Sequence, residues 1–179
     1  PPGRSRMAHT SLPGGPMSAR RLADGNTLVA LSDADLVAEY DPQGKMVWSA
    51  KVVGRPCDAR RLAGGGTLVA AHRGNRIVEI DATGQETVVV RDIEDPQAVQ
   101  RLPNGHMLVA MSEPGIVREI DRDGRVVWQQ GGFKVPIDAQ RLPDGRTLVQ
   151  EMQGDLVELD VDGTELGRMK TGGTRFLRF

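Results

Sequence analysis

A histidine in a short loop is the residue of this chain best suited to proton transfer. His72 opens the tetrapeptide His72-Arg73-Gly74-Asn75, in a loop expected between two β-strands. An imidazole there could act as acid or base near neutral pH, although a lone loop histidine is more often simply solvated. The equivalent loops carry different residues at this place, namely Glu113, Asp33 and Gln153. Such variation is what a specific binding surface would show, and drift in an unconstrained loop would show it too.

Three connecting segments supply the second group of candidates. Each contains a proline, at positions 56, 96 and 136, that fixes the chain as it enters the next strand, while the surrounding charges differ. Loops on a rigid scaffold are where binding groups usually lie. We therefore predict a ligand-binding surface built from both groups of segments: Arg55, His72, Arg73, Asn75, Glu94, Asp95, Glu113, Phe133 and Lys134.

The remaining reactive groups predict neither a catalytic centre nor a metal site. Cys57 is the sole cysteine, so we expect a small apolar filler and no internal disulfide. The segment Asp121-Arg-Asp123-Gly124 has too few oxygen ligands for a calcium loop, and a tight Asp-Gly turn explains it. No phosphate loop, zinc spacing or nucleophile elbow is found. We predict no catalytic residue, no metal and no cofactor, and a protein that is more a binder than an enzyme.

The candidate residues belong to a sequence that repeats. Leu22, Leu62, Leu102 and Leu142 are spaced 40 residues apart. The unit that starts at Arg101, Arg-Leu-Pro-Asn-Gly-His-Met-Leu-Val-Ala, returns from Arg141 as Arg-Leu-Pro-Asp-Gly-Arg-Thr-Leu-Val-Gln. A fixed period of this size is the signature of a repeat architecture.

Each repeat divides into four short β-segments separated by turns, at 18–22, 27–30, 36–40 and 45–49 in the first copy. No window shows helical periodicity. The run Leu28-Val29-Ala30 is apolar in succession, as in strands covered on both faces. Four-stranded sheets stacked radially provide that cover, which predicts a β-propeller of four blades of about 40 residues. An open β-solenoid and a sandwich are the competing architectures, and the sandwich ranks last because it needs no such self-similarity.

The expected blades are 18–57, 58–97, 98–137 and 138–170, within a propeller region of 16–179. A lead segment, 1–15, could add a lone outer strand, and the tail 171–179 resembles an inner strand starting again. Three arrangements remain open: a closed four-blade ring, a piece of a larger propeller, or half of an eight-blade ring made by two chains. Exposed blade faces in a half ring favour self-association, so a homo-oligomer is one expectation.

One arginine and one glutamate recur in every repeat. The arginines are Arg21, Arg61, Arg101 and Arg141, and the glutamates are Glu39, Glu79, Glu119 and Glu158. One interpretation is a charged ring around the propeller axis. The other is that each arginine pairs with a glutamate or with backbone carbonyls, inside or between blades. Ligand sites usually break symmetry, so four equal copies favour the structural interpretation.

The repeat resembles that of quinoprotein-like propellers, and equally that of arylsulfotransferase-type propellers. The likeness rests on Leu-Pro-Asn-Gly-His-Met-Leu-Val-Ala followed by Val-Arg-Glu-Ile-Asp-Arg-Asp-Gly-Arg-Val-Val-Trp. The stretch Ala38-Glu-Tyr-Asp41-Pro-Gln-Gly44-Lys-Met-Val-Trp48 is similar to the tryptophan docking motif that ties quinoprotein blades together. The resemblance covers about 18–170 and implies a propeller, but this repeat is found in enzymes, scaffolds and sensors alike.

The chain departs from the family's enzymes in several places. Val88 and Gly167 stand where the other two repeats have Trp48 and Trp128. Quinoprotein dehydrogenases hold their quinone with adjacent cysteines and calcium, and only Cys57 is present here. No histidine matches the arylsulfotransferase nucleophile. The family resemblance implies a periplasmic or secreted location. The chain opens Pro-Pro-Gly-Arg-Ser without an apolar signal stretch, so we expect a processed, trimmed or recombinant start.

Composition narrows the class of partner. The formal net charge of −1 gives no electrostatic case for nucleic acid or an anionic membrane, and no apolar run is long enough to insert into a bilayer. We therefore predict a non-catalytic module that recognises a protein or small ligand through its loops. Two alternatives stay open: a part or degenerate relative of a quinoprotein- or sulfotransferase-like enzyme, and a structural module that self-assembles through blade edges.

Overall fold

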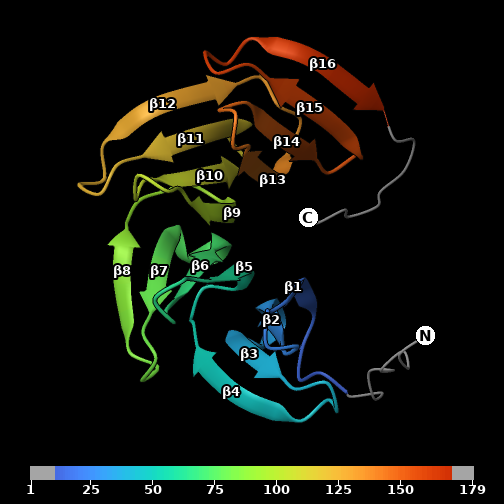
Figure 1. Ribbon diagram of the computed structural model, residues 1–179, viewed down its shortest axis with the longest axis vertical. Helices are drawn as coiled ribbons and strands as arrows, with labels where there is room; N and C mark the ends of the chain where they lie inside the picture. The colour runs from blue at the N-terminus through green and yellow to red at the C-terminus, as the bar shows by residue number, and fades with distance from the viewer. Residues whose placement is uncertain (1–10, 171–179) are drawn as a thin grey trace.

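Figure 1 shows the computed structural model of the chain, which describes residues 11–170. The described residues form four antiparallel sheets of four strands each, and within every sheet the strands neighbour one another in sequence order. Short turns join consecutive apolar segments, and such turns allow only antiparallel pairing. The predicted all-β architecture of four four-stranded blades is confirmed.

The strands follow the repeat closely. The first blade contains β1 (Pro16–Arg21), β2 (Thr27–Leu31), β3 (Leu36–Tyr40) and β4 (Met46–Lys51). The second contains β5 (Pro56–Arg61), β6 (Thr67–Ala71), β7 (Arg76–Ile80) and β8 (Glu86–Val90). The third contains β9 (Pro96–Arg101), β10 (Met107–Met111), β11 (Ile116–Ile120) and β12 (Val126–Gly131). The fourth contains β13 (Pro136–Arg141), β14 (Thr147–Glu151), β15 (Asp155–Leu159) and β16 (Glu165–Lys170). Two 3₁₀ turns, η1 (Ser32–Ala34) and η2 (His72–Gly74), follow β2 and β6.

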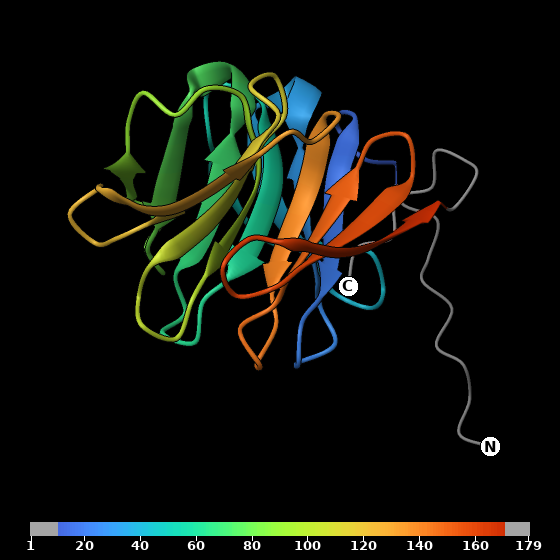
Figure 2. The same ribbon diagram turned by 90° about the horizontal axis from the view of Figure 1, so that it is seen from above.

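The blades are arranged radially as a β-propeller. The inner strands β5, β9 and β13 each pack against the first two strands of the preceding blade, and the last strand of each blade lies at the periphery (Figure 1). Viewed from above, the sheets stand side by side (Figure 2). Within residues 11–170, no strand of the fourth blade packs against the first blade as neighbouring blades do. The four blades therefore form a propeller with one open side.

The second strand of each blade forms the centre of the core. Every residue of β2, β6 and β10 is buried. These strands are apolar in succession because a neighbouring sheet or segment covers each face, as the sequence pattern predicts. The outer strand β16 is instead exposed along its whole length.

Two kinds of turn close the hairpins at one end of the blades. Gly25, Gly105 and Gly145 have φ values of 88°, 85° and 91°, the left-handed region that the predicted Asp-Gly and Asn-Gly turns require. Between the third and fourth strands, the carboxylate of Asp121 accepts the backbone N–H groups of Asp123 and Arg125, at 2.9 and 2.8 Å. These hydrogen bonds, first that from Arg125, hold the pKa of Asp121 below its ordinary value. The predicted tight turn is confirmed at this segment.

The recurring arginine and glutamate join neighbouring blades. In the second, third and fourth blades, the arginine at the end of the inner strand forms an ion pair with the glutamate on the third strand of the preceding blade, which we call the latch. The three latches are Arg61–Glu39, Arg101–Glu79 at 2.8 Å and Arg141–Glu119 at 2.9 Å. The structural interpretation of these residues is confirmed, because the pairs lie between blades.

Tryptophan stacks on two of the three latches. The guanidinium of Arg61 lies 4.7 Å from the Trp48 ring centroid, and that of Arg141 lies 4.7 Å from the Trp128 centroid. Stacking of this kind adds a cation–π attraction to the ion pair and shields it from water. The two tryptophans therefore dock blades, as the resemblance to the quinoprotein motif implies.

One arginine and one glutamate at the latch positions form no latch within residues 11–170. Arg21 donates to the carbonyl of Gly25, and Glu158 pairs with Arg146 of its own blade. Neither has a latch partner among the described residues. Arg21 belongs to the first blade and Glu158 to the fourth, so the unused halves flank the open side of the propeller.

Cys57 is fully buried between the second and third blades. Its thiol Sγ lies 3.1 Å from the carbonyl oxygen of Pro96 and 3.4 Å from that of Ala70. The expectation of a small buried filler is confirmed. The tail 171–179 and positions 1–10 of the lead segment lie outside the described residues, and positions 11–15 form no strand.

Candidate functional site

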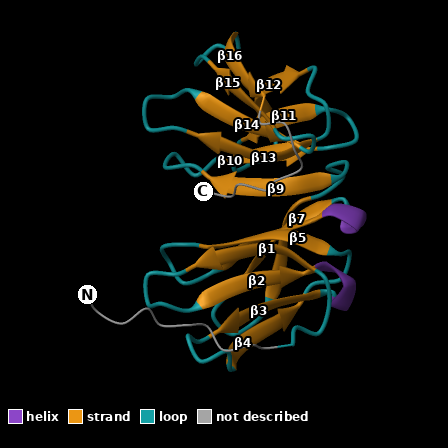
Figure 3. Ribbon diagram, turned by 90° about the vertical axis from the view of Figure 1, so that its right-hand side faces the viewer, coloured by secondary structure: helices purple, strands orange, loops and turns teal. Residues whose placement is uncertain are grey.

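The candidate binding surface lies at the end of the blades opposite the glycine turns. It consists of the loops after the second strands (32–35, 72–75, 112–115 and 152–154) and the connections between blades (52–55, 91–95 and 132–135), and we call it the loop face. Antiparallel pairing brings both kinds of segment to one end of each sheet. Figure 3 shows η1 and η2 together on this side of the molecule. All nine residues predicted from the sequence belong to these segments.

The connections enter each blade through a left-handed residue just before the proline. Arg55, Asp95 and Val135 have φ values of 58°, 43° and 55°. This conformation turns each carbonyl toward the neighbouring loop, where it accepts an N–H, at 3.3 Å from His72, 3.1 Å from Ser112 and 3.0 Å from Met152. A β-branched residue such as Val135 adopts this φ only at a cost of about 1–3 kcal/mol. The repeated hydrogen bond is what holds it, so these loops are fixed by backbone bonds.

Asp95 joins the second and third blades across the loop face. Its Oδ1 lies 3.1 Å from Nδ1 of His72 and accepts a hydrogen bond from the Gln97 amide at 2.9 Å. Its Oδ2 accepts the backbone N–H of Glu113 at 3.1 Å. An imidazole held through Nδ1 keeps Nε2 for another partner, so His72 can bind a polar group. The structure thus brings together three residues that the sequence singled out.

Asp33 and Arg55 form a second pair, between the first and second blades. Their side chains are ion-paired and about half exposed. The backbone N–H of Arg55 donates to Oδ1 of Asp35 at 2.8 Å, which fixes the connection beneath the guanidinium. Asn75 has the equivalent role in the second blade, because its Oδ1 accepts the N–H of Asp95 at 3.1 Å. The Asn75 side chain therefore shapes the loop.

Four predicted residues offer charged side chains with no internal partner. Arg73, Glu94, Glu113 and Lys134 are exposed, and their side chains form no hydrogen bond or ion pair within residues 11–170. Glu113 and Lys134 are held only by backbone bonds, the latter from its N–H to Glu151 Oε1 at 2.8 Å. These predicted residues thus give the loop face two cations and two anions without a partner among residues 11–170, on a fixed backbone.

Phe133 requires a correction. The sequence places it among the contact residues of a connection, but its side chain is buried and belongs to the core between the third and fourth blades. Val52 and Ile93 occupy the same place in the two preceding connections and are buried as well. An apolar residue at this position fixes each connection to the core, so Phe133 supports the loop face from the interior.

A second polar site, which the sequence interpretation missed, lies where the inner strands converge. The guanidinium groups of Arg20 and Arg60 and the carboxylates of Asp58 and Asp138 form one cluster, which we call the hub. Asp58 is completely buried, and its two oxygens face Arg20 at 3.2 Å and Arg60 at 3.1 Å. Asp138, from the fourth blade, lies 2.8 Å from Arg60 and 3.7 Å from Arg20. The hub therefore links the first, second and fourth blades.

The charges in the hub balance. Burial alone would lower the pKa of the Arg60 guanidinium, but Asp58 and Asp138 more than offset this effect, so its pKa is raised. Backbone groups complete the cluster: the Val99 N–H donates to Asp58 at 3.2 Å, which adds the third blade. Two cations and two anions satisfy one another, so the arrangement is suited to holding four inner strands together.

Comparison with known proteins places this geometry in a family. A family model described as "Outer membrane protein assembly factor BamB", built on PQQ-like repeats, matches residues 4–131, which is more than half of the sequence. The chain belongs to this family. The resemblance to the quinoprotein-like repeat is therefore confirmed. No curated protein matches the sequence significantly.

Solved structures share the fold of this PQQ-like chain at low sequence identity. A protein of unknown function from Bacteroides caccae has a TM-score of 0.76 and 19% identity, and the match covers 94% of this chain and 74% of that one. A streptogramin B lyase has a TM-score of 0.71 and 15% identity, with 89% and 56% covered. Virginiamycin B lyase from Staphylococcus aureus, solved with quinupristin, has a TM-score of 0.68 and 14% identity, with 87% and 55% covered. The chain spans about half the length of both lyases, and at these identities the likeness concerns the fold alone.

The PQQ-like repeat itself contains the signal that would have revealed the hub. The positions that supply it read Ser18, Asp58, Ala98 and Asp138 on one side, and Arg20, Arg60, Gln100 and Gln140 on the other. Charged pairs in only some copies of a regular repeat break its symmetry. The sequence analysis considered the residues that all four copies share, and therefore did not identify the hub residues.

Proposed function

We propose that this chain is a non-catalytic binding module that recognises a partner protein through the loop face. The observation that supports the proposal most directly is the set of free charges on Arg73, Glu94, Glu113 and Lys134, presented on a backbone that is hydrogen-bonded in every connection. A pre-ordered surface loses little conformational entropy on binding. Alternating cations and anions complement a protein surface of mixed charge and select its orientation.

The family suggests the setting in which such a partner would be found. Its description names a factor that assembles outer-membrane proteins, which is an activity of the cell envelope. We therefore propose that the partner is an envelope protein and that the chain works in the periplasm or is secreted. No helix among the described residues is long and apolar enough to cross a membrane.

Charge reversal tests the loop face directly. A variant with Arg73→Glu, Glu94→Lys, Glu113→Lys and Lys134→Glu keeps the net charge, because two changes in each direction cancel. The matched control carries Lys45→Glu and Asp123→Lys, two exposed residues in turns at the opposite end of the blades. Both proteins and the wild type, each with a photo-crosslinking residue in place of Asp92, are incubated with a detergent extract of the source organism's envelope.

We expect the wild type and the control to give the same crosslinked protein and the four-residue variant to lose it. Circular dichroism and urea unfolding must first show that all three proteins fold alike. Equal crosslinking by the four-residue variant would contradict the proposal, as would a crosslink that the control loses to the same extent.

A second candidate, self-assembly through blade edges, is favoured by the two unused latch halves. Arg21 and Glu158 carry the groups that meet at every internal interface, and they flank the open side. A second copy could dock its first blade on the fourth blade of its neighbour through the same ion pair. Light scattering at rising concentration tests this candidate: a mass above that of the 19.4 kDa monomer, abolished by Glu158→Arg and restored by adding Arg21→Glu, is expected. A monomer at all concentrations would exclude it.

A further inference from the structure

The interface between the second and third blades lacks the tryptophan that completes the other two. Trp48 lies opposite Glu39 in the strand register, and Trp128 lies opposite Glu119. In the second blade, the residue opposite Glu79 is Thr87, which is exposed. A 40-residue spacing would have placed Val88 there, but the register shift lies between Ile77 and Val78 in this blade and two pairs later in the others. Arg101 therefore has a latch glutamate but no indole.

The same interface also lacks a second hydrogen-bond donor to its glutamate. Glu39 accepts from Asn26 at 2.6 Å, and Glu119 lies 2.8 Å from His106, each in addition to the latch arginine. The equivalent position in the second blade is Gly66, so Glu79 uses only Oε2, toward Arg101. The side chain of Glu79 is 37% exposed, whereas those of Glu39 and Glu119 are 11% and 14% exposed. Its Oε1 is thus an available acceptor.

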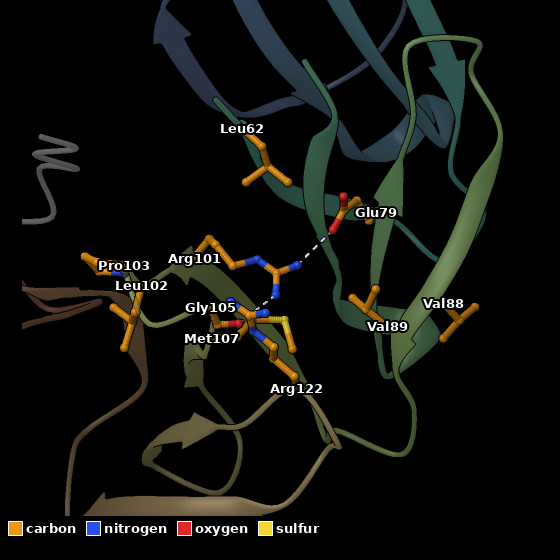
Figure 4. A pocket seen from close by; sticks show the side chains of 10 residues that line it. All are labelled: Leu62, Glu79, Val88, Val89, Arg101, Leu102, Pro103, Gly105, Met107 and Arg122. Carbon is orange, nitrogen blue, oxygen red and sulfur yellow. Dashed lines mark hydrogen bonds and ion pairs between the residues drawn. The ribbon is translucent and has the colours of Figure 1, made fainter. Parts of the chain in front are cut away.

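These two omissions open a groove, shown in Figure 4. Its volume is about 710 Å³, and it extends from the inner-strand turn to β8, with Val89, Leu102 and Met107 among its apolar walls. The hollows at the other two interfaces are smaller, about 570 and 420 Å³, and no residue of an outer strand lines them. In Figure 4, Arg101 lies in the middle of the groove and Arg122 lies beside it.

We propose that this groove binds a tryptophan side chain of a partner polypeptide, flanked by acidic residues. The indole stacks on the Arg101 guanidinium, as Trp48 and Trp128 stack on their own arginines. Oε1 of Glu79 accepts an N–H of the occupant. Arg122 is exposed and, within residues 11–170, donates only to the Asn104 carbonyl at 3.2 Å, so it receives the flanking carboxylate.

The molecule itself supplies the template for this occupant. At two interfaces the arginine at this repeat position lies 4.7 Å from the centroid of an indole ring. The third arginine, Arg101, ends an equivalent inner strand, so the backbone around it can place its guanidinium against the same kind of ring. An aromatic ring on a partly desolvated guanidinium gains both cation–π attraction and burial of a large apolar surface. The groove has two arginines against one glutamate, so its excess charge is positive and favours an acidic segment.

The groove is independent of the loop face. It is lined by Pro103, Gly105 and Arg122, which belong to turns at the opposite end of the blades. A partner held on the loop face would leave it open. The tests of the two surfaces therefore fail or succeed separately.

A fluorinated peptide tests the proposal. The probe is N-acetyl-Asp-(5-fluorotryptophan)-Asp-amide. It is observed by ¹⁹F NMR while the 179-residue chain is added, because the protein itself contributes no fluorine signal. We expect the resonance to shift and broaden, and the affinity to fall about tenfold or more for a peptide with 4-fluorophenylalanine between lysines in place of the aspartates. An unlabelled Asp-Trp-Asp peptide should displace the probe, and Asp-Ala-Asp should not.

Filling the groove from within gives the sharper test. Thr87→Trp should place the protein's own indole on Arg101, raise the midpoint of thermal unfolding and abolish binding of the probe. The matched control, Ser49→Trp, adds an indole to β4 away from any latch arginine and should leave binding unchanged. Arg122→Glu provides a variant of an exposed residue that keeps the fold: it should weaken the Asp-flanked probe and favour a Lys-flanked one.

Several results would overturn the proposal. These are equal affinity for the Trp and Ala peptides, unchanged binding in a folded Thr87→Trp protein, and, should that variant fail to fold, unchanged flank preference in Arg122→Glu. Indole-3-acetate that binds as tightly as the peptide would assign the groove to a small aromatic acid, and the polypeptide occupant would then be wrong.

Discussion

The latches and the hub both pair arginine with a carboxylate, but they differ in burial and in which strands they join. Each latch joins one blade to the next and recurs with the repeat, at partly exposed positions. The hub occurs once within residues 11–170, contains the fully buried Asp58, and connects the inner strand of the second blade both to the first blade and to the distant fourth blade. The comparison shows that a repeat protein can join neighbouring blades with an ion pair that recurs in the repeat, and join its inner strands near the axis with a cluster that only some copies supply.

The difference in burial predicts a difference in energy. Exposed ion pairs contribute about 0–1 kcal/mol because water screens them. A buried pair contributes little over an apolar substitute, but removing one partner leaves a charge stranded in the interior. Mutations in the hub should therefore be more harmful than the same changes in a latch.

Asp58→Asn should have the largest effect. It leaves Arg20 and Arg60 facing an uncharged amide at a fully buried position, and we expect a loss of about 3–5 kcal/mol in the free energy of unfolding. Urea denaturation followed by circular dichroism measures it, with the exposed Asp123→Asn as control. A loss below about 1 kcal/mol would mean that hub and latch do not differ in the way proposed.

Arg141→Met should have an intermediate effect, of about 1–3 kcal/mol. It removes the ion pair with Glu119 and the stacking on Trp128, both partly screened by water. Arg21→Met is the matched control, because Arg21 stands at the same repeat position without an incoming glutamate, and its change should stay below about 0.5 kcal/mol. Equal losses at the two positions would show that the latch itself adds no stability.

Acid should weaken the turns through exposed carboxylates. Hydrogen bonds, first that from the N–H of Arg125, hold the pKa of Asp121 below its ordinary value of 3.8. Its contribution to stability is therefore complete above that value and disappears as the pH falls through the lower pKa of the folded state. In Asp121→Asn, which keeps the turn acceptor but cannot titrate, the urea midpoint should change less than in the wild type between about pH 5 and about pH 2.5. Parallel behaviour of the two proteins would contradict this assignment.

Glu94→Ala should have the smallest effect. The side chain is exposed on the loop face and has no partner within residues 11–170, so the free energy of unfolding should change by less than about 0.5 kcal/mol. Thermal and urea unfolding both measure this. Marked destabilisation would mean that Glu94, like the latch residues, stabilises the fold, and would contradict its place in the proposed binding surface.

The sequence predicted the features that every repeat shares. Gly25, Gly105 and Gly145 marked hairpins because the Asp-Gly and Asn-Gly dipeptides favour a left-handed residue, and the recurring arginine and glutamate indicated a structural pair. Such signals depend on local backbone preference or on repetition, and both are visible in one chain without coordinates.

Features that depend on differences between repeats were harder to predict. The hub requires residues from three blades to meet, which no spacing reveals, although the alternation of Asp58 and Asp138 with Ser18 and Ala98 marked the position. Phe133 was chosen because it lies in a variable connection, while Val52 and Ile93 at the same place already showed an apolar anchor. Thr87 took the place expected for Val88 because a shift in strand register moves the chain by one residue, and register is set by tertiary packing.

The buried thiol has a practical consequence. Cys57 lies between the second and third blades without exposure to solvent, so an alkylating reagent can modify it only when those blades separate. The rate of that modification measures how often this interface opens, in the unaltered protein. Because the same interface lacks an indole, the natural cysteine sits where opening of the propeller is easiest to follow by mass spectrometry.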